Sequence, residues 1–453
     1  MSWTETHAKA LDAAFTALDA AGINWLVLRN HEGLPQSNRS KDVDLGLEKS
    51  DFRGAERAIS GAVGEVGFDR VMVDDFQYVR GLTFFRMDGP SPQSIKIDLL
   101  DGFVFRGAQV FHFRQLFADA RRDGRLVVPS VNDDAVMLWA KPLLTGGIVK
   151  PKYLPDIERA ARRDPQGFRA VLDRIFTPDL AEKAWSKIAA GNVDATIPMK
   201  AELRRSAWHR ALRRNPVRTL RDALHHVVAE LARRSRRNPA TMISVIGPDG
   251  VGKTTFIERF AAGLADLQVK DRETIEVQHF RPQLIPNINQ LLTGKPEVVS
   301  EFNNPHSAAP VSMPSSLLRI SYYWTDYVLG YWLKNRRRLI RGRNIIFDRY
   351  FFDFIVDPRR SRLTLPGWVP HLFLAATPQP DLVFFLDAEA DDIFARKQEL
   401  QPDEIARQLA AYRALSERDP SRFVRLDASQ SPDLVARDAL RAVIERSYPK
   451  IRT

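Results

Sequence analysis

Residues 242–256 contain a glycine-rich turn whose residue types and spacing suit phosphate binding. The apolar run 242–246 leads into Gly247-x-x-x-x-Gly252-Lys253-Thr254, and apolar residues at helical spacing follow. Glycines let the backbone curl so that successive N–H groups point at phosphate oxygens, and the first turn of a helix adds partial positive charge. The lysine can reach the β- and γ-phosphates of ATP, and the next hydroxyl can ligate Mg²⁺. The residues expected to bind the nucleotide are Gly247, Asp249, Gly250, Gly252, Lys253, Thr254 and Thr255.

Two later strands end in residues that suit phosphoryl transfer. The apolar run 344–347 is followed by Asp348 and Arg349. An acid at such a strand end lies near Mg²⁺, and an arginine there can face the transferring phosphoryl group. A second predicted strand at 380–387 precedes a predicted helix with Arg396 and Lys397, whose cations could close over ATP as a lid. The alternatives are a strand-end salt bridge and a solvated helix face. We expect Lys253, Asp348, Arg349 and Arg396 to be catalytic, with Thr254 and Asp348 as Mg²⁺ ligands.

A second group of acids lies near the start of the chain. Asp42 and Asp44 lie two residues apart on a predicted strand, so their carboxylates share one face. Asp98 lies on a later strand of the same character. Three carboxylates that converge from two strands could hold one or two Mg²⁺ ions, which can clamp the attacking and leaving oxygens of a nucleotidyl transfer. The alternative is a set of exposed or salt-bridged strand acids. Lys141, Lys150 and Lys152 could approach a triphosphate or be ordinary surface lysines.

The residues from 242 to 447 resemble the thymidylate kinase family of nucleoside monophosphate kinases. The shared features are the Gly-x-Asp-Gly-x-Gly-Lys-Thr-Thr loop, the Asp348-Arg349-Tyr350 strand end, the Pro-Asp-Leu-x-x-x-Leu-Asp strand and the Arg396 region. The resemblance implies that Lys253 and Arg349 stabilise the phosphoryl group and that Thr254 and Asp348 hold Mg²⁺. The acceptor region departs from the family, because residues 279–282 read His-Phe-Arg-Pro where the family has Arg-x-Pro-Gly-Gly. An arginine cluster at 359–362 suits an anionic acceptor.

Residues 20–160 resemble the small nucleotidyltransferases of the DNA polymerase β type. The resemblance implies that Asp42 and Asp44 are metal ligands and that Asp98 is the third acid. The family's Gly-Ser pair before the acids is missing, and the chain has Arg29-Asn30 and later Ser40-Lys41 instead.

The periodicity of apolar residues indicates how the chain is organised. The first part is predicted to contain short strands together with helices at 6–21 and 51–64. Residues 130–190 and 200–237 are predicted to be helical. From residue 242 onward, strands alternate with helices. We therefore expect α/β and α+β classes. The predicted domains are a nucleotidyltransferase-like mixed sheet at 1–128, a helical, basic connecting region at 129–238, and a P-loop parallel sheet flanked by helices at 239–453.

Composition restricts the classes of partner and compartment. The absence of cysteine excludes disulfides, thiolate nucleophiles and cysteine zinc sites. The net charge is +11, and residues 200–238 hold twelve lysines and arginines against three acids. This segment could bind nucleic acid or an anionic membrane surface, although solvated helix faces are the favoured interpretation. We expect a cytoplasmic protein without a signal peptide or membrane span. The sequence leaves open whether the chain forms a homodimer.

These features favour an ATP- and Mg²⁺-dependent phosphotransferase that acts on a small, anionic acceptor. Fusion to a nucleotidyltransferase-like domain suggests a bifunctional enzyme of activated-sugar or surface-polysaccharide metabolism. The alternatives are a nucleotide-gated regulatory or nucleic-acid-binding protein and a protein-modifying nucleotidyltransferase.

Overall fold

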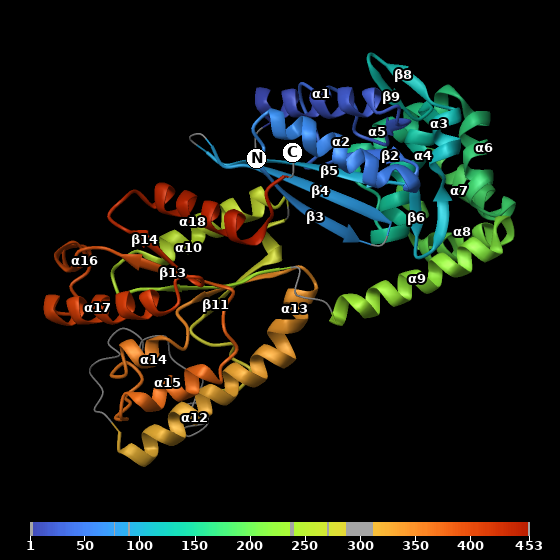
Figure 1. The fold of residues 1–453 in the computed structure, drawn as a ribbon. Coiled ribbons are helices and arrows are strands. Elements are labelled where there is room, and N and C mark those ends of the chain that lie inside the picture. Colours follow the sequence, from blue (N-terminus) through green and yellow to red (C-terminus); the bar gives the residue numbers. More distant parts are fainter. Residues whose placement is uncertain are drawn as a thin grey trace. The chain divides into compact units, whose positions relative to one another are not determined.

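The computed structural model describes residues 3–76, 78–88, 91–235, 240–269, 271–286 and 311–451. These residues form two compact units (Figure 1). The first contains the described parts of 1–89, 93–232 and 448–453, and the second contains those of 90–92 and 233–447. Residues 287–310 and residues 236–238 of the basic segment lie outside the described residues. The domain boundaries after residues 128 and 238 stay predictions.

The first unit is built on a mixed sheet of five strands in the order β1-β2-β5-β4-β3. The neighbours β2 and β5 run parallel, and the other pairs run antiparallel. The parallel pairing places Asp44 directly opposite Asp98. The strands are β1 (Trp25–Val27), β2 (Val43–Leu47), β3 (Arg70–Phe76), β4 (Val79–Arg86) and β5 (Gln93–Leu100).

Helices cover this sheet because its side chains alternate between two faces. Val43, Leu45 and Leu47 of β2 pack in one buried core with α1 (Glu5–Ala20) and α2 (Phe52–Glu65). A second core is centred on Trp139 and takes in side chains of β1, of β5 and of the helices that follow. Those helices are α3 (Phe113–Ala118), α4 (Val131–Gly146), α5 (Leu154–Arg163), α6 (Pro165–Ile175), α7 (Pro178–Ala189) and α8 (Lys200–Arg214). The helix α9 (Pro216–Ser235) follows them and contributes no residue to this core among those described. Two hairpins, β6 (Phe103–Phe105) with β7 (Ala108–Phe111) and β8 (Arg121–Asp123) with β9 (Leu126–Val128), complete the unit.

The second unit has a parallel sheet of five strands in the order β11-β12-β10-β13-β14. The strands are β10 (Met242–Ile246), β11 (Ile275–His279), β12 (Asn344–Asp348), β13 (Leu382–Asp387) and β14 (Phe423–Asp427). The first strand in the chain, β10, is central, so the strand order reverses beside it. Such a switch point opens a crevice at the carboxyl ends of the strands, where ligands bind in parallel α/β sheets.

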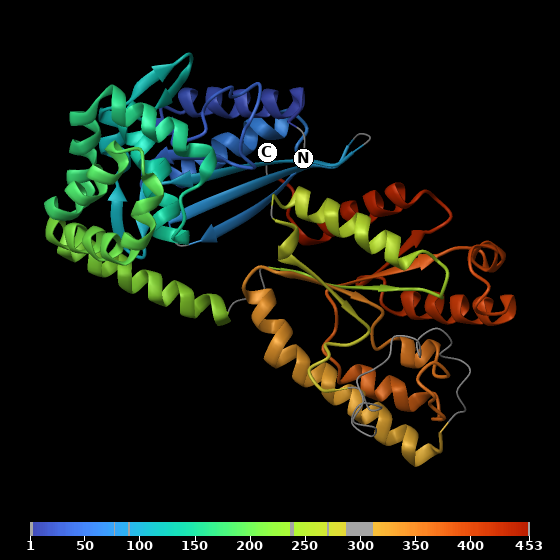
Figure 2. The same ribbon diagram turned by 180° about the vertical axis from the view of Figure 1, so that it is seen from behind.

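Helices cover both faces of the parallel sheet, and α10 and α18 lie side by side on one of them (Figure 2). The helices are α10 (Lys253–Leu267), α12 (Met313–Gly330), α13 (Arg336–Ile340), α14 (Asp353–Val356), α15 (Trp368–Ala375), α16 (Ala390–Arg396), α17 (Pro402–Arg418) and α18 (Pro432–Ser447). The mixed sheet and the parallel sheet confirm the predicted α+β and α/β classes. Within the described residues, no helix has the length and apolar character needed to cross a bilayer.

Candidate functional site

The glycine-rich turn follows β10 and leads directly into α10. Its three motif glycines adopt positive φ angles of 149° at Gly247, 90° at Gly250 and 102° at Gly252. Residues with a Cβ atom rarely adopt such angles, so glycine is needed for the turn to curl back before the helix. The first residue of α10 is Lys253, and the unsatisfied N–H groups of the first turn therefore border the loop.

The lysine side chain lies within the curl of the loop. Lys253 Nζ donates hydrogen bonds to the carbonyl oxygens of Gly247 at 2.9 Å and Pro248 at 2.7 Å. Burial, together with the nearby Arg349 cation, lowers the pKa of Lys253 to about 8. The next two residues, Thr254 and Thr255, are exposed, so their hydroxyls can reach a ligand.

Asp348 ends β12 beside this loop and pairs with His279 at the end of β11. His279 Nδ1 lies 3.1 Å from Asp348 Oδ2. The other carboxylate oxygen, Oδ1, is buried and has no hydrogen-bond partner among the described residues. Burial disfavours the charge, but the His279 hydrogen bond and the Lys253 cation lower the pKa of Asp348. An ionised carboxylate with an unpaired oxygen is suited to ligate a divalent cation, directly or through water.

Arg349 is held between two acids. It is 3% exposed and has a φ of 72°, which is uncommon for a residue other than glycine. Its guanidinium donates to Asp249 of the glycine-rich turn and, at 2.5 Å, to Asp353 Oδ2. Arg360 also donates to Asp249, so two arginines meet one carboxylate of the loop. Burial opposes this charge, but the cations of Arg349, Lys253 and Arg360 hold the pKa of Asp249 well below its usual range.

Arg396 lies on a different side of the loop. Its Nη1 donates to the carbonyl oxygen of Ala428 at 3.1 Å, in the turn that follows β14. The neighbouring Lys397 lies against the glycine-rich turn, because a Cβ atom on Gly250 would come within 3.0 Å of the Lys397 Cβ. The structure thus brings Lys253, Asp348 and Arg349 together, and it places Arg396 at the turn that follows β14.

The three acids of the first unit converge. Asp42 precedes β2, Asp44 lies within it and Asp98 lies opposite on β5. Each offers a carboxylate oxygen, and these three oxygens lie within 4.8 Å of one another. Asp98 Oδ1 is buried without a hydrogen-bond partner among the described residues. An acid cluster with an unpaired, buried oxygen fits a divalent cation.

Basic side chains already offset much of this negative charge. Asp44 accepts a hydrogen bond from Arg29 and lies 3.5 Å from Lys141 Nζ, while Lys96 Nζ lies 3.3 Å from Asp98. Burial would raise the pKa of Asp44, but Lys141 and Arg29 lower it to about 2. Burial raises the pKa of Asp98 to about 6, because Lys96 only partly offsets it. Lys141 is therefore a member of the acid cluster rather than an ordinary surface lysine.

Sequence reasoning missed several of these side chains. Lys96 had a usable signal, because it precedes Asp98 by two residues on one strand and must share its face. Arg29 lies two residues after β1, and nothing local indicates its pairing with Asp44. His279 meets Asp348 through strand order, and Arg360 of the predicted arginine cluster meets Asp249 of the nucleotide loop through a long-range contact.

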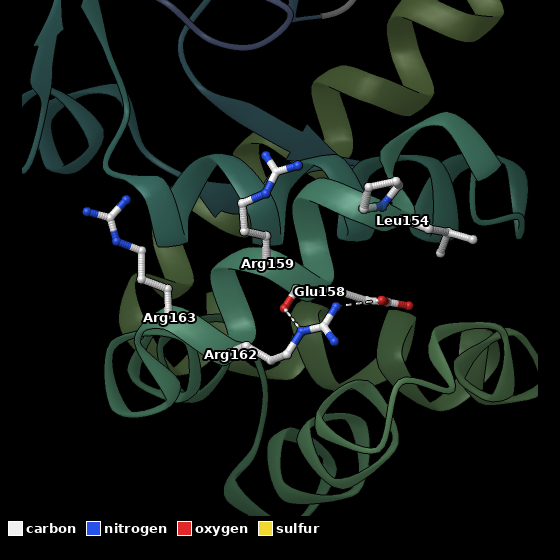
Figure 3. A pocket seen from close by; sticks show the side chains of 6 residues that line it. Leu154, Glu158, Arg159, Arg162 and Arg163 are labelled. Atoms are coloured by element: carbon white, nitrogen blue, oxygen red, sulfur yellow. Dashed lines mark hydrogen bonds and ion pairs between the residues drawn. The ribbon is translucent and has the colours of Figure 1, made fainter.

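A separate pocket lies on α5 (Figure 3). Its lining residues are Leu154, Pro155, Glu158, Arg159, Arg162 and Arg163. Arg162 donates to the backbone and side-chain oxygens of Glu158, as the dashed lines in Figure 3 indicate. None of the predicted site residues lines this pocket.

Comparison with known proteins supports a kinase-like domain. No protein-family model matches the chain. A thymidylate kinase of Thermomicrobium roseum is 32% identical over 125 residues, which represent 25% of this chain. The chain spans 59% of the length of that relative. The crystal structure of thymidylate kinase from Ehrlichia chaffeensis aligns with a TM-score of 0.32 and 14% sequence identity. The alignment covers 45% of this chain and 98% of the kinase chain. A likeness of this size carries no argument about function.

Proposed function

We propose that the second unit is an ATP-dependent phosphotransferase of the nucleoside-monophosphate-kinase type, acting on a small anionic acceptor. The observation that carries the proposal is the meeting of Lys253, Asp348 and Arg349 at the glycine-rich turn. A GTPase switch or a motor does not require an arginine at the end of the strand that carries the Mg²⁺-associated acid. An arginine there suits transfer of the γ-phosphoryl group to an acceptor.

The residues present suit MgATP. Thr254 and Asp348 would hold Mg²⁺, which neutralises the phosphate oxygens when it is bound. The N–H groups of the turn and of the first turn of α10 bind the phosphates, and Lys253 exchanges its two carbonyl partners for phosphate oxygens. Arg349 stabilises charge on the phosphoryl group in transfer, and its two acids fix the direction of the guanidinium. Arg396 and the turn at Ala428 border the adenine.

The acceptor is expected to carry phosphate or carboxylate. Arg349 and Arg360 converge on Asp249 beside the transfer site, so an anionic acceptor could exchange with this carboxylate for a guanidinium partner. Residues 279–282 depart from the thymidylate kinase pattern, so thymidylate is not favoured over other anionic acceptors. A phosphorylated sugar is an equally suitable acceptor by this chemistry.

Transfer of the γ-phosphate from labelled ATP to panels of nucleoside monophosphates and sugar phosphates tests the proposal. We expect Lys253→Ala to lower the turnover about 100-fold or more, because a preorganised cation is lost from the transition state. Lys183→Ala, at an exposed position of α7, is the matched control and should retain full activity. Absence of transfer to every acceptor, with the wild type equal to Lys253→Ala, would exclude the kinase function.

The acid cluster of the first unit supports a second proposed activity, nucleotidyl transfer. Asp42, Asp44 and Asp98 would hold one or two Mg²⁺ ions, which assist attack on an α-phosphate when bound. Arg29, Lys96 and Lys141 are suited to bind the triphosphate. Together the two units would phosphorylate a small molecule and activate the product as a nucleotide conjugate, an order of chemistry found in activated-sugar metabolism.

Labelling with α-labelled ATP distinguishes this activity from the kinase reaction. With the phosphorylated acceptor supplied, we expect a small-molecule product that retains the label and that disappears in the Asp42→Asn/Asp44→Asn variant but not in Lys253→Ala. Label on a protein instead would indicate a protein-modifying nucleotidyltransferase. Without label transfer, a nucleotide-gated regulatory or nucleic-acid-binding function becomes the better alternative.

A further inference from the structure

The helix α9 docks on the first unit by its polar side. Tyr78 Oη donates to the carbonyl oxygen of Asp222 at 2.9 Å, and the Tyr78 ring stacks on His226 with centroids 6.2 Å apart. Arg218 Nη2 donates to Asp101 Oδ2 at 3.0 Å, and Thr219 is buried. An amphipathic helix normally buries its apolar stripe against its own domain. Here the side that faces the first unit carries these polar, charged and aromatic groups together with the small Ala223, which lies against Gly107.

The apolar stripe of α9 is exposed on the side of the helix that faces away from the first unit. Its six members are Val217, Leu220, Leu224, Val227, Val228 and Leu231, and each is between 52% and 77% exposed. Their spacings of three and four residues place all six within one sector of the helix. Contiguous apolar surface of this kind marks an interaction site rather than a random surface residue.

The charge around the stripe indicates what covers it. Arg221 follows Val217 by four residues and precedes Leu224 by three, so it borders the stripe, and it is exposed. The segment 200–238 carries twelve basic residues against three acids. Arg221 beside an exposed aliphatic stripe, within a segment of net positive charge, is the composition of a helix that lies in the interface of an anionic membrane.

Other occupants fit less well. The exposed area of this one stripe of six aliphatic side chains is smaller than the ~800 Å² that each partner buries in a standard protein–protein interface. A single-stranded nucleic acid would be expected to stack on aromatic side chains, and the stripe has only valine and leucine. We propose that α9 is an interfacial helix that places this stripe on a membrane surface of anionic phospholipid and holds the protein there. This proposal is independent of the activities of the two units.

Sedimentation of the full chain with vesicles tests the inference. The vesicles are phosphatidylcholine alone and phosphatidylcholine mixed with phosphatidylglycerol. We expect binding to the mixed vesicles only, weakening as salt rises, and about tenfold weaker binding for Leu220→Gln/Leu224→Gln because the apolar contact is lost. The matched control is Leu318→Gln/Leu372→Gln, at exposed leucines of α12 and α15, which should bind like the wild type. Arg205→Gln/Arg213→Gln/Arg221→Gln should weaken binding and flatten its salt dependence.

Three outcomes would overturn the inference. The first is vesicle binding that is the same for the wild type and the Leu220→Gln/Leu224→Gln variant. The second is a wild type that does not bind vesicles, together with a lower melting temperature for Leu220→Gln/Leu224→Gln than for the wild type. That result would mean that the stripe is covered by another part of the protein or by a second copy of it. A change of that melting difference with protein concentration would then identify a second copy. The third is tighter binding to a DNA duplex than to mixed vesicles, unaffected by the leucine substitutions.

Discussion

At the scale of single residues, the nucleotide loop contains a buried cation whose protonation can be followed. Lys253 has a pKa lowered from 10.5 to about 8 by burial, so the unfolded chain binds its proton more strongly than the folded one. The stability of the nucleotide-free protein should therefore rise as the pH increases from about 8 toward 10.5. Lys253→Met should remove this part of the rise, which melting temperatures at a series of pH values will measure.

Nucleotide binding should show the opposite trend with pH. The phosphates require the charged ammonium, so ATP affinity should fall above a pH of about 8, by at most about tenfold per pH unit. Lys253→Arg keeps its charge throughout this range and should show a flat profile, even if its affinity is lower. Isothermal titration calorimetry provides the measurement. An equal slope for the wild type and the arginine variant would contradict the assignment of this pKa to the ATP site.

At the scale of elements, the turn between β10 and α10 depends on backbone angles rather than on space. Gly252 has a φ of 102°, and a Cβ atom there would meet nothing within 4 Å. Gly61 in α2 also has open space around its Cβ position but lacks a positive φ. Gly252→Ala should cost about 1–2 kcal/mol from backbone strain, while Gly61→Ala should stabilise by about 0.5–1 kcal/mol. Chemical denaturation measures both, and an equal effect at the two positions would contradict the argument.

Sequence patterns predicted those parts of the molecule that depend on residues close together in the sequence. The apolar run before Gly247, the turn and the helix after it are local features, and alternation in β2 and β5 indicated which acids share a face. The pairing of Arg360 with Asp249 could not be predicted, since 111 residues separate them and only the folded sheet brings them together. Lys141 has the same limitation, because its approach to Asp44 depends on how α4 packs over the sheet. The outward stripe of α9 is another case, since periodicity locates an apolar face but not which face docks.

At the scale of the whole molecule, the chain passes between the two units more than once. After α18 of the second unit, residues 448–451 belong to the first unit and run beside β3, where Arg70 and Lys450 form an antiparallel bridge. Val71 N donates to Pro449 O at 3.2 Å, and Ile451 N donates to Asp69 O at 2.8 Å. The second unit is thus inserted in the sequence of the first.

This topology predicts that residues 448–451 stabilise the first unit, although the residues before them in the sequence belong to the second unit. The Tyr448 ring stacks on the fully buried Phe85, with centroids 5.1 Å apart, and Ile451 packs against the core of α1 and α2. Deletion of residues 448–453 removes these contacts and exposes the edge of β3, so the first unit should lose about 2–4 kcal/mol of stability. Calorimetry with and without ATP, in the Asp42→Asn/Asp44→Asn background that disables the acid cluster, separates the units, because the ligand then raises only the transition of the second. The deletion should lower the ATP-insensitive transition and leave the ATP-dependent shift intact. Tyr448→Ala should produce a smaller loss in the same transition, and a loss confined to the ATP-sensitive one would refute the assignment of the tail.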